Sequence, residues 1–383
     1  MPHLTRIRPL LLLALLAVFA APFLARSAAA FAPQDTATPA SLSCTPAPPA
    51  PADSVPATPA ATPSAQPTSS TNAEPVEVTI GYVAISIYAP VFVAQEKGYF
   101  AEQGLDVTLE RFAGGPEPVV LTANGQLDAA TAGAGPAFWN AVAQGLPLTV
   151  VAPGHAEGNP VATPLMISKA SCESGAIRSV ADLRGKRVAV NARGATEYWL
   201  GRALATGDLT LGDIDLQTLA FPEAVAALES GALDASMVAE PLATKAEQDG
   251  IAVRLATDFP VQDVQPTVIV ANSDFARDNP AAVTGLVTAY LKACRDLNGA
   301  GFKDPANLAI IEQYTGVPAA LVGAAVQPVY AVDGAIDVAG LSKLQSFFRD
   351  QDQLEYDDDL DPASFVDTQF VEAALAALGP ANE

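Results

Sequence analysis

The sequence has little material for metal-binding or sulfur chemistry. Among its 383 residues there are three cysteines and two histidines. Cys44, Cys172 and Cys294 lie far apart, with no Cys-x-x-Cys pair and no neighbouring pair of histidines. Neither a tetrahedral zinc site nor a disulfide framework is therefore indicated, and whether Cys172 and Cys294 pair stays open. We expect no metal ion and no cofactor.

Positive charge is also scarce. Lys and Arg together number 20 against 42 Asp and Glu, which gives a formal net charge of −22. A surface this acidic repels phosphate backbones, so we expect no nucleic-acid partner. Hydrophobic residues make up 50% of the chain. At this length, that share is enough to bury one or two substantial cores.

The amino-terminal end has the pattern of an export signal. Arg6 and Arg8 precede an apolar run at residues 10–19, and the alanines at 28–30 supply small residues for cleavage. The run is shorter than the ~20 apolar residues that cross a bilayer comfortably. We therefore expect a signal over residues 1–30, with an uncleaved anchor as the alternative. The protein would be exported, to the periplasm or to the outer face of the cytoplasmic membrane.

Residues 31–75 are dominated by Pro, Ala, Thr and Ser. Such a composition cannot bury enough apolar surface to offset the entropy lost on ordering, so we interpret it as a disordered spacer. Within it, Ser-Leu-Ser-Cys at 41–44 faintly resembles a lipoprotein box, which makes Cys44 a candidate for lipidation. The segment departs from that box because its leucine comes one position late and because the box should directly follow the apolar run.

The body of the chain contains an internal repeat. Residues 116–130 read PEPVVLTANGQLDAA and residues 222–236 read PEAVAALESGALDAS. Each copy predicts a helix that Pro-Glu opens and a glycine ends, at Gly125 and Gly231, followed by a short strand. In open α/β sheets, ligands lie beyond the carboxyl ends of the strands, where helix N-termini offer free N–H groups. Two such units predict two lobes that face one cleft.

Several phrases near the start of this body resemble a known family. Residues 94–100 read AQEKGYF, with Gly-Tyr at 81–82 and Ala-Pro at 89–90 before them and Gly-Leu-Asp-Val at 104–107 after them. These phrases resemble substrate-binding proteins of ABC importers, in the group that handles nitrate, sulfonates and taurine. The group also includes binders of the thiamine pyrimidine precursor. The resemblance covers roughly residues 76–351.

This resemblance implies the type II periplasmic binding fold, in which two open α/β sheets are joined by a hinge and the ligand lies in the cleft. We expect lobe 1 to hold residues 76–163 and 271–383, and lobe 2 to hold residues 164–270. The implied partners are a small-molecule ligand and the transmembrane subunits of an ABC permease, with the protein itself a monomer. The alternative is a ligand-sensing module that presents its loaded form to a membrane receptor.

An enzyme is the least favoured class. Pyrimidine synthases related to this family use clustered cysteines and histidine. Here the histidines are His3 and His155, and the cysteines are dispersed. We therefore expect a binding protein and not an enzyme.

The candidate ligand contacts of lobe 1 are small or aromatic residues at the ends of expected strands: Tyr88, Gly114, Gly133, Ala134 and Gly135. The small loops leave room for a ligand larger than nitrate, and Tyr88 could stack on a ring. His155 follows the strand expected at residues 148–151. It either donates to a ligand carboxylate or sulfonate, or is an idle histidine of a surface loop.

In lobe 2, an expected strand ends in Arg193-Gly194-Ala195-Thr196, and a helix follows. The resemblance implies a Gly-Ser/Thr loop here, whose N–H groups and hydroxyl hold the polar head of the ligand. The partial positive charge of a helix N-terminus supports this role. The alternative for Thr196 is a plain N-cap. Arg193 either supplies charge to the site or is solvated at the rim.

Glu240 directly precedes Pro241, where the family often has an acidic or aromatic residue. If Glu240 faces the cleft, it would bind a cationic or N–H-bearing ligand and discourage a bare anion. The alternative is a solvated glutamate in the first turn of a helix. Our first choice of ligand is a small organic anion, such as an alkanesulfonate or an aromatic acid. The second choice is a pyrimidine- or flavin-type heterocycle held partly by Glu240.

Overall fold

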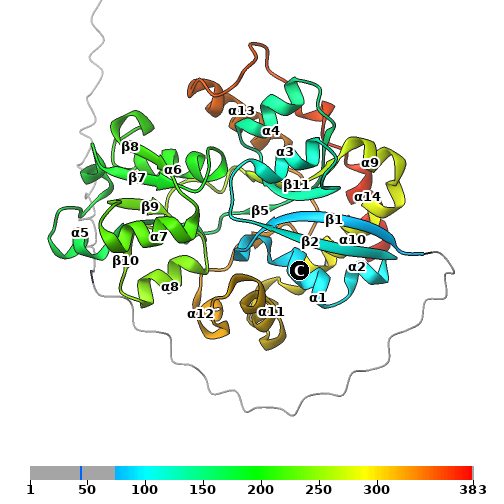
Figure 1. Ribbon diagram of the computed structural model, residues 1–383, viewed down its shortest axis with the longest axis horizontal. Coiled ribbons are helices and arrows are strands. Elements are labelled where there is room, and N and C mark those ends of the chain that lie inside the picture. Colours follow the sequence, from blue (N-terminus) through cyan, green and yellow to red (C-terminus); the bar gives the residue numbers. More distant parts are fainter. Residues whose placement is uncertain (1–43, 45–73, 382–383) are drawn as a thin grey trace, which may run out of the picture. The chain divides into compact units, whose positions relative to one another are not determined.

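The computed structural model describes residue 44 and residues 74–381 (Figure 1). The expected export signal, and the spacer apart from residues 44, 74 and 75, lie outside these described residues. No described helix is both long enough and apolar enough to cross a membrane.

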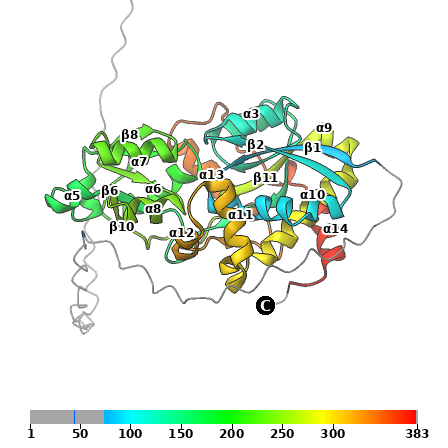
Figure 2. The same ribbon diagram turned by 60° about the horizontal axis from the view of Figure 1, so that its bottom comes forward.

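Two five-stranded sheets organise the described chain, one in each lobe (Figures 1 and 2). The sheet of lobe 1 has the order β2-β1-β3-β11-β4, with β1 (Val76–Val83), β2 (Leu105–Phe112), β3 (Ala129–Gly133), β4 (Leu148–Pro153) and β11 (Thr267–Asn272). The sheet of lobe 2 has the order β10-β6-β9-β7-β8, with β6 (Leu165–Ser168), β7 (Arg187–Val190), β8 (Asp215–Thr218), β9 (Ala235–Met237) and β10 (Ala252–Ala256). A two-stranded sheet pairs β5 (His155–Ala156) with β12 (Val329–Tyr330).

Helices cover both faces of the sheet of lobe 1. Those around it are α1 (Ala89–Glu96), α2 (Tyr99–Glu102), α3 (Glu117–Ala123), α4 (Pro136–Ala143), α9 (Ser273–Asp278), α10 (Pro280–Asp296), α11 (Pro305–Thr315) and α14 (Gln369–Leu378). Figures 1 and 2 show α3 on the face opposite α1 and α10. On the α1 side, Val78 and Ile80 of β1 share one core with Phe92 and Tyr290. The parallel strands β2, β1 and β3 are covered on both faces, and such strands require apolar residues.

Lobe 2 is smaller and carries α5 (Lys169–Glu173), α6 (Ala195–Ala205), α7 (Phe221–Ser230) and α8 (Leu242–Gln248). Two later helices pack against both lobes, α12 (Ala319–Ala324) and α13 (Val338–Asp350). The ring of Phe347 in α13 packs edge-on against Tyr198 of α6, with 5.2 Å between ring centroids. Part of the expected lobe 1 segment at 271–383 therefore packs on lobe 2.

The boundary expected at residues 270 and 271 also needs correction. All of β11 lies in the sheet of lobe 1, antiparallel to both β3 and β4. The last strand of the lobe 2 sheet is β10, which ends at Ala256. The chain therefore returns to lobe 1 before residue 267. Although β11 follows lobe 2 in the sequence, its hydrogen bonds to β3 and β4 make it a strand of the lobe 1 sheet.

Both copies of the internal repeat form the predicted helix and strand, as α3 with β3 and α7 with β9. Gly125 and Gly231 have φ of 69° and 73°, the left-handed conformation that ends a helix. The repeated aspartate accepts an equivalent main-chain hydrogen bond in each copy. Asp128 accepts from the Thr79 N–H at 2.7 Å, and Asp234 accepts from the Arg187 N–H at 2.9 Å. Each aspartate thus fastens its strand to the parallel neighbour, β3 to β1 and β9 to β7.

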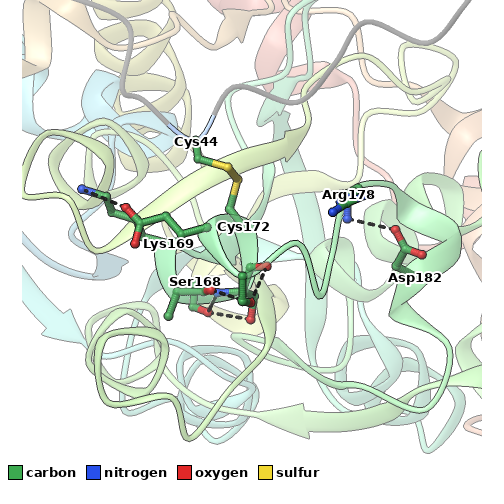
Figure 3. Close-up of a disulfide and its surroundings, with 10 residues drawn as sticks. Cys44, Ser168, Lys169, Cys172, Arg178 and Asp182 are labelled. Carbon is green, nitrogen blue, oxygen red and sulfur yellow. Dashed lines mark hydrogen bonds and ion pairs between the residues drawn. A yellow bond between two sulfur atoms is a disulfide. The ribbon is translucent and has the colours of Figure 1, made fainter.

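A disulfide joins Cys44 to Cys172 of α5 (Figure 3). No sequence pattern indicated this bond, because the two cysteines are 128 positions apart and Cys44 lies in a low-complexity segment. The pairing of Cys172 with Cys294 does not form, since Cys294 is buried as a free thiol. The hypothesis that Cys44 carries a lipid is also wrong, because its sulfur is already bonded.

We predict that Cys44→Ser lowers the free energy of unfolding by about 2–4 kcal/mol, because the disulfide restricts the unfolded chain. Denaturant unfolding with and without reductant measures this loss. Reductant should destabilise the wild type by the same amount and leave the variant unaffected. Equal midpoints for the oxidised wild type and the variant would contradict the prediction.

We also predict that Asp128→Ala lowers the free energy of unfolding by about 1–3 kcal/mol, because the Thr79 N–H loses its acceptor. Asp128→Asn retains an acceptor oxygen and should cost less. The control is Asp106→Ala, which removes an exposed aspartate of β2 that makes no side-chain hydrogen bond among the described residues. Urea unfolding would refute the role of Asp128 if its alanine variant loses no more than the Asp106 variant.

Candidate functional site

A cavity lies beyond the carboxyl ends of the strands, where loops of the two lobes meet. It contains about 750 Å³ of empty space, part of which is open to solvent. Lobe 1 lines it with residues that end or follow β1, β2 and β3. Lobe 2 lines it with the loop between β7 and α6 and with the start of α7. The prediction that two repeated units face one cleft is therefore confirmed.

Most of the predicted contacts lie around this cavity. Its lining includes Tyr88, Gly114, Gly133, Gly135, Arg193, Gly194, Ala195 and Thr196. Ala134 is buried without lining the cavity, and its N–H donates to the carbonyl of Pro266. His155 and Glu240 also lie outside the lining.

The two lobes touch through backbone at Gly135 and Gly194. A Cβ added to Gly135 would lie 2.9 Å from the Cα of Gly194 and 2.9 Å from the carbonyl oxygen of Arg193. The φ of Gly135 is −88°, which any residue can adopt, so close approach alone requires glycine there. Gly194 has φ of 154°, a conformation that itself favours glycine. The glycines at residues 133–135, which were predicted to leave room for a ligand, also allow the two lobes to contact each other.

The first turn of α6 lines the cavity through Ala195 and Thr196. Gly194 is the N-cap, and no side chain caps this helix end. The hydroxyl of Thr196 donates to Asn191 Oδ1 at 2.6 Å and to the Ala192 carbonyl at 3.2 Å. The N-cap alternative for Thr196 is therefore wrong, and its hydroxyl proton is already engaged. The N–H groups of the first turn have no partner within the helix and carry partial positive charge.

Arg193 lies at the rim with its charge already matched. Its Nη1 donates to Glu197 Oε1 at 2.6 Å, with 49% of the Arg193 side chain exposed and none of the Glu197 side chain. The same oxygen of Glu197 accepts from Gln353 Nε2 at 2.8 Å. Arg193 is thus only partly solvated, and a ligand anion would compete with Glu197 for it.

His155 fits neither of its two interpretations. Its side chain is buried, so it is not an idle surface histidine. Its Nδ1 lies 2.8 Å from Thr267 Oγ1, and its ring packs edge-on against Trp199 at 5.5 Å between centroids. Thr267 and Trp199 line the cavity, and His155 supports them from behind.

Glu240 is also buried and does not face the cleft. Its Oε1 accepts from Arg254 Nη2 at 2.8 Å and from Thr244 Oγ1 at 3.0 Å. The Val326 N–H adds a contact of 3.3 Å. Burial alone would lower the pKa of Arg254, but Glu240 and Glu247 hold that pKa above its usual value. Both the ligand-binding and the solvated interpretations of Glu240 are wrong, because this buried ion pair engages the carboxylate.

Several lining residues were not predicted, notably Thr131, Thr163, Asn191, Phe221 and Thr267. The repeat contained a signal for one of them. Gly115 and Phe221 occupy the equivalent position before the helix-opening proline in the two copies, and both line the cavity. No group of three or more His, Cys, Asp or Glu in the described part of the chain is placed to hold a metal ion.

Known proteins with similar sequences are transport and binding proteins. The bicarbonate transport ATP-binding protein CmpC of Synechocystis sp. is 30% identical over a match of 241 residues, and the match covers 58% of this chain and 35% of CmpC. This chain thus matches well under two thirds of the length of CmpC. The taurine-binding periplasmic protein of Escherichia coli is 29% identical over 254 residues, which are 64% of this chain and 75% of that protein.

Solved structures share the fold. The alkanesulfonate-binding protein SsuA from Xanthomonas axonopodis pv. citri, bound to MOPS, matches with a TM-score of 0.64 and 22% identity over 77% of this chain and 99% of SsuA. The desulfurization enzyme DSZB matches with a TM-score of 0.55 and 17% identity over 79% of this chain and 99% of that chain. These likenesses confirm the two-lobed α/β fold, which serves a binding protein and an enzyme alike.

The profile of the NMT1-like family matches residues 71–314, well over half of the chain. The chain therefore belongs to the NMT1-like family, in the nitrate, sulfonate and taurine group of substrate-binding proteins that its sequence resembles.

Proposed function

We propose that the protein is the extracytoplasmic solute-binding component of an ABC importer. It captures a small organic anion, such as a sulfonate or an aromatic acid, by closing its two lobes and delivers it to a membrane permease. The observation that carries this proposal is the cavity enclosed where the loop at residues 133–135 meets the loop at residues 193–195. Taurine and an alkanesulfonate are the ligands named for two of the similar proteins.

The chemistry of the lining favours an organic ligand over nitrate or bicarbonate. Ile85, Phe138 and Phe221 give the cavity apolar walls, which a small, fully polar ion would leave unmatched. The N–H groups of α6 suit one acidic head group. Burial raises the pKa of Tyr88, so its phenol stays neutral and does not repel an anion. The heterocycle alternative depended on Glu240, whose carboxylate is engaged by Arg254 and Thr244.

A binding role also fits the side chains present. The lining contains no Cys, His, Asp or Glu among the residues that the structure describes. Burial raises the pKa of the Cys294 thiol to about 12, which keeps it protonated and unreactive. The site therefore offers positioned donors and apolar walls without an evident nucleophile and base.

The disulfide between Cys44 and Cys172 supports an extracytoplasmic location, because such bonds persist in oxidising compartments. The export signal expected at residues 1–30 agrees with this location. We place the protein in the periplasm or on the outer face of the cytoplasmic membrane, acting as a monomer that docks on permease subunits.

A thermal-shift screen tests the proposed ligand class on the exported protein. We predict that an alkanesulfonate, taurine or an aromatic acid raises the melting temperature, because a ligand that binds only the native state stabilises it by about 2.7 kcal/mol at a hundredfold excess over Kd. Nitrate should give no shift. A shift confined to riboflavin or thiamine precursors would refute the organic-anion assignment.

We further predict that Gly135→Ala weakens binding of the ligand found in that screen by about tenfold or more, since an overpacked contact costs ~1–3 kcal/mol. The added Cβ would meet backbone atoms of Arg193 and Gly194 at 2.9 Å. The comparison is Gly133→Ala. Its added Cβ would lie 3.5 Å from the Cβ of Ala195, an ordinary contact distance, so this variant should lose less affinity. Calorimetric titration measures both, and equal losses would argue against closure at Gly135.

A further inference from the structure

A second pocket adjoins the ligand cavity at the seam between the lobes. It contains about 670 Å³ of empty space, partly open to solvent, at the ends of β1 and β2 and the starts of α7 and α8. Val83, Ile85 and Phe221 line both this pocket and the ligand cavity. Val83 and Ile85 belong to lobe 1 and Phe221 to lobe 2, so the boundary between the two spaces lies at the seam between the lobes.

The second pocket contains a cation, Arg111, that has no counterion in the described part of the chain. Arg111 lies near the end of β2, paired in register with Tyr82 of β1. Among the described residues, its side chain forms no ion pair and no hydrogen bond. Burial raises the pKa of Tyr82, and the charge of Arg111 opposes that rise, which reflects how near the two groups are. Arg193, the cation of the first cavity, is instead bound to Glu197.

The charge of the rest of the protein makes this cation unusual. The full chain has a net charge of −22, so the protein repels an approaching anion at long range. At physiological ionic strength that repulsion is screened beyond ~8 Å, so an exposed arginine dominates the potential in its own pocket. A guanidinium can also hold a carboxylate or sulfonate through two parallel hydrogen bonds.

We propose that Arg111 and the shared apolar residues form a distal ligand subsite, so that the site takes an elongated organic acid with an anionic group at each end. This inference rests on the proposed function. One anionic group binds at the N-terminus of α6, the apolar body crosses the seam between Ile85 and Phe221, and the second anionic group binds Arg111. The closed lobes hold the ligand at both ends.

The test compares linear alkane-1-sulfonates with the matching α,ω-alkanedisulfonates over increasing chain length, by calorimetric titration of the exported protein. Above a threshold length, the disulfonate should bind about tenfold more tightly than the monosulfonate. Arg111→Gln should reduce that ratio to near one, and Arg111→Lys should restore part of it. Lys303→Gln is the matched control, because it removes one exposed positive charge that lines neither pocket.

Three outcomes would overturn the inference. If disulfonates of every length bind no better than monosulfonates, the subsite is absent and the proposed function still stands. If Lys303→Gln lowers the ratio as much as Arg111→Gln does, the effect comes from net charge and not from a subsite. If neither series binds the wild-type protein, the sulfonate class fails, and the distal subsite fails with it.

Discussion

The approach of two backbones, at Gly135 and Gly194, limits how closely the lobes can come together. Neither residue has a side chain, so the distance is set by main-chain atoms that cannot rotate away. This contact places the start of α6 against the loop that follows β3, and both segments line the cavity. Because backbone atoms form this contact, the closest distance between the two loops is fixed. Ligands of different size then have to be accommodated by movement of the side chains that line the cavity.

The internal repeat explains why each lobe contributes a helix, a short strand and a following loop to the cleft. In each copy, an aspartate binds the main chain of the neighbouring parallel strand through its carboxylate and through its own N–H. Asp128 does this with Thr79, and Asp234 with Arg187. A parallel pair of strands has no hairpin to fix its register. The aspartate supplies that local constraint, and the loop that follows each strand is thereby held at the cleft.

The parts of the structure that the sequence predicted depend on neighbours in the chain. Proline and glycine at the ends of helices, and small residues after strands, act over a few positions, so the repeat and the loops of the cleft could be read directly. Glu240 could not be, because its position before Pro241 says nothing of Val326, which comes from a remote segment. His155 depends in the same way on Thr267, 112 positions later. Burial of these polar groups was decided by contacts that no local pattern contains.

The disulfide changes the covalent connectivity of the molecule. The polypeptide enters the fold through β1, in lobe 1, whereas Cys44 is bonded to α5, in lobe 2. Cys44 and Cys172 therefore close a covalent ring that contains most of the sheet of lobe 1. A protease that cut between residues 45 and 73 would open this ring without releasing the segment that contains Cys44. The amino-terminal segment has two independent covalent routes to the body, and one of them does not pass through β1.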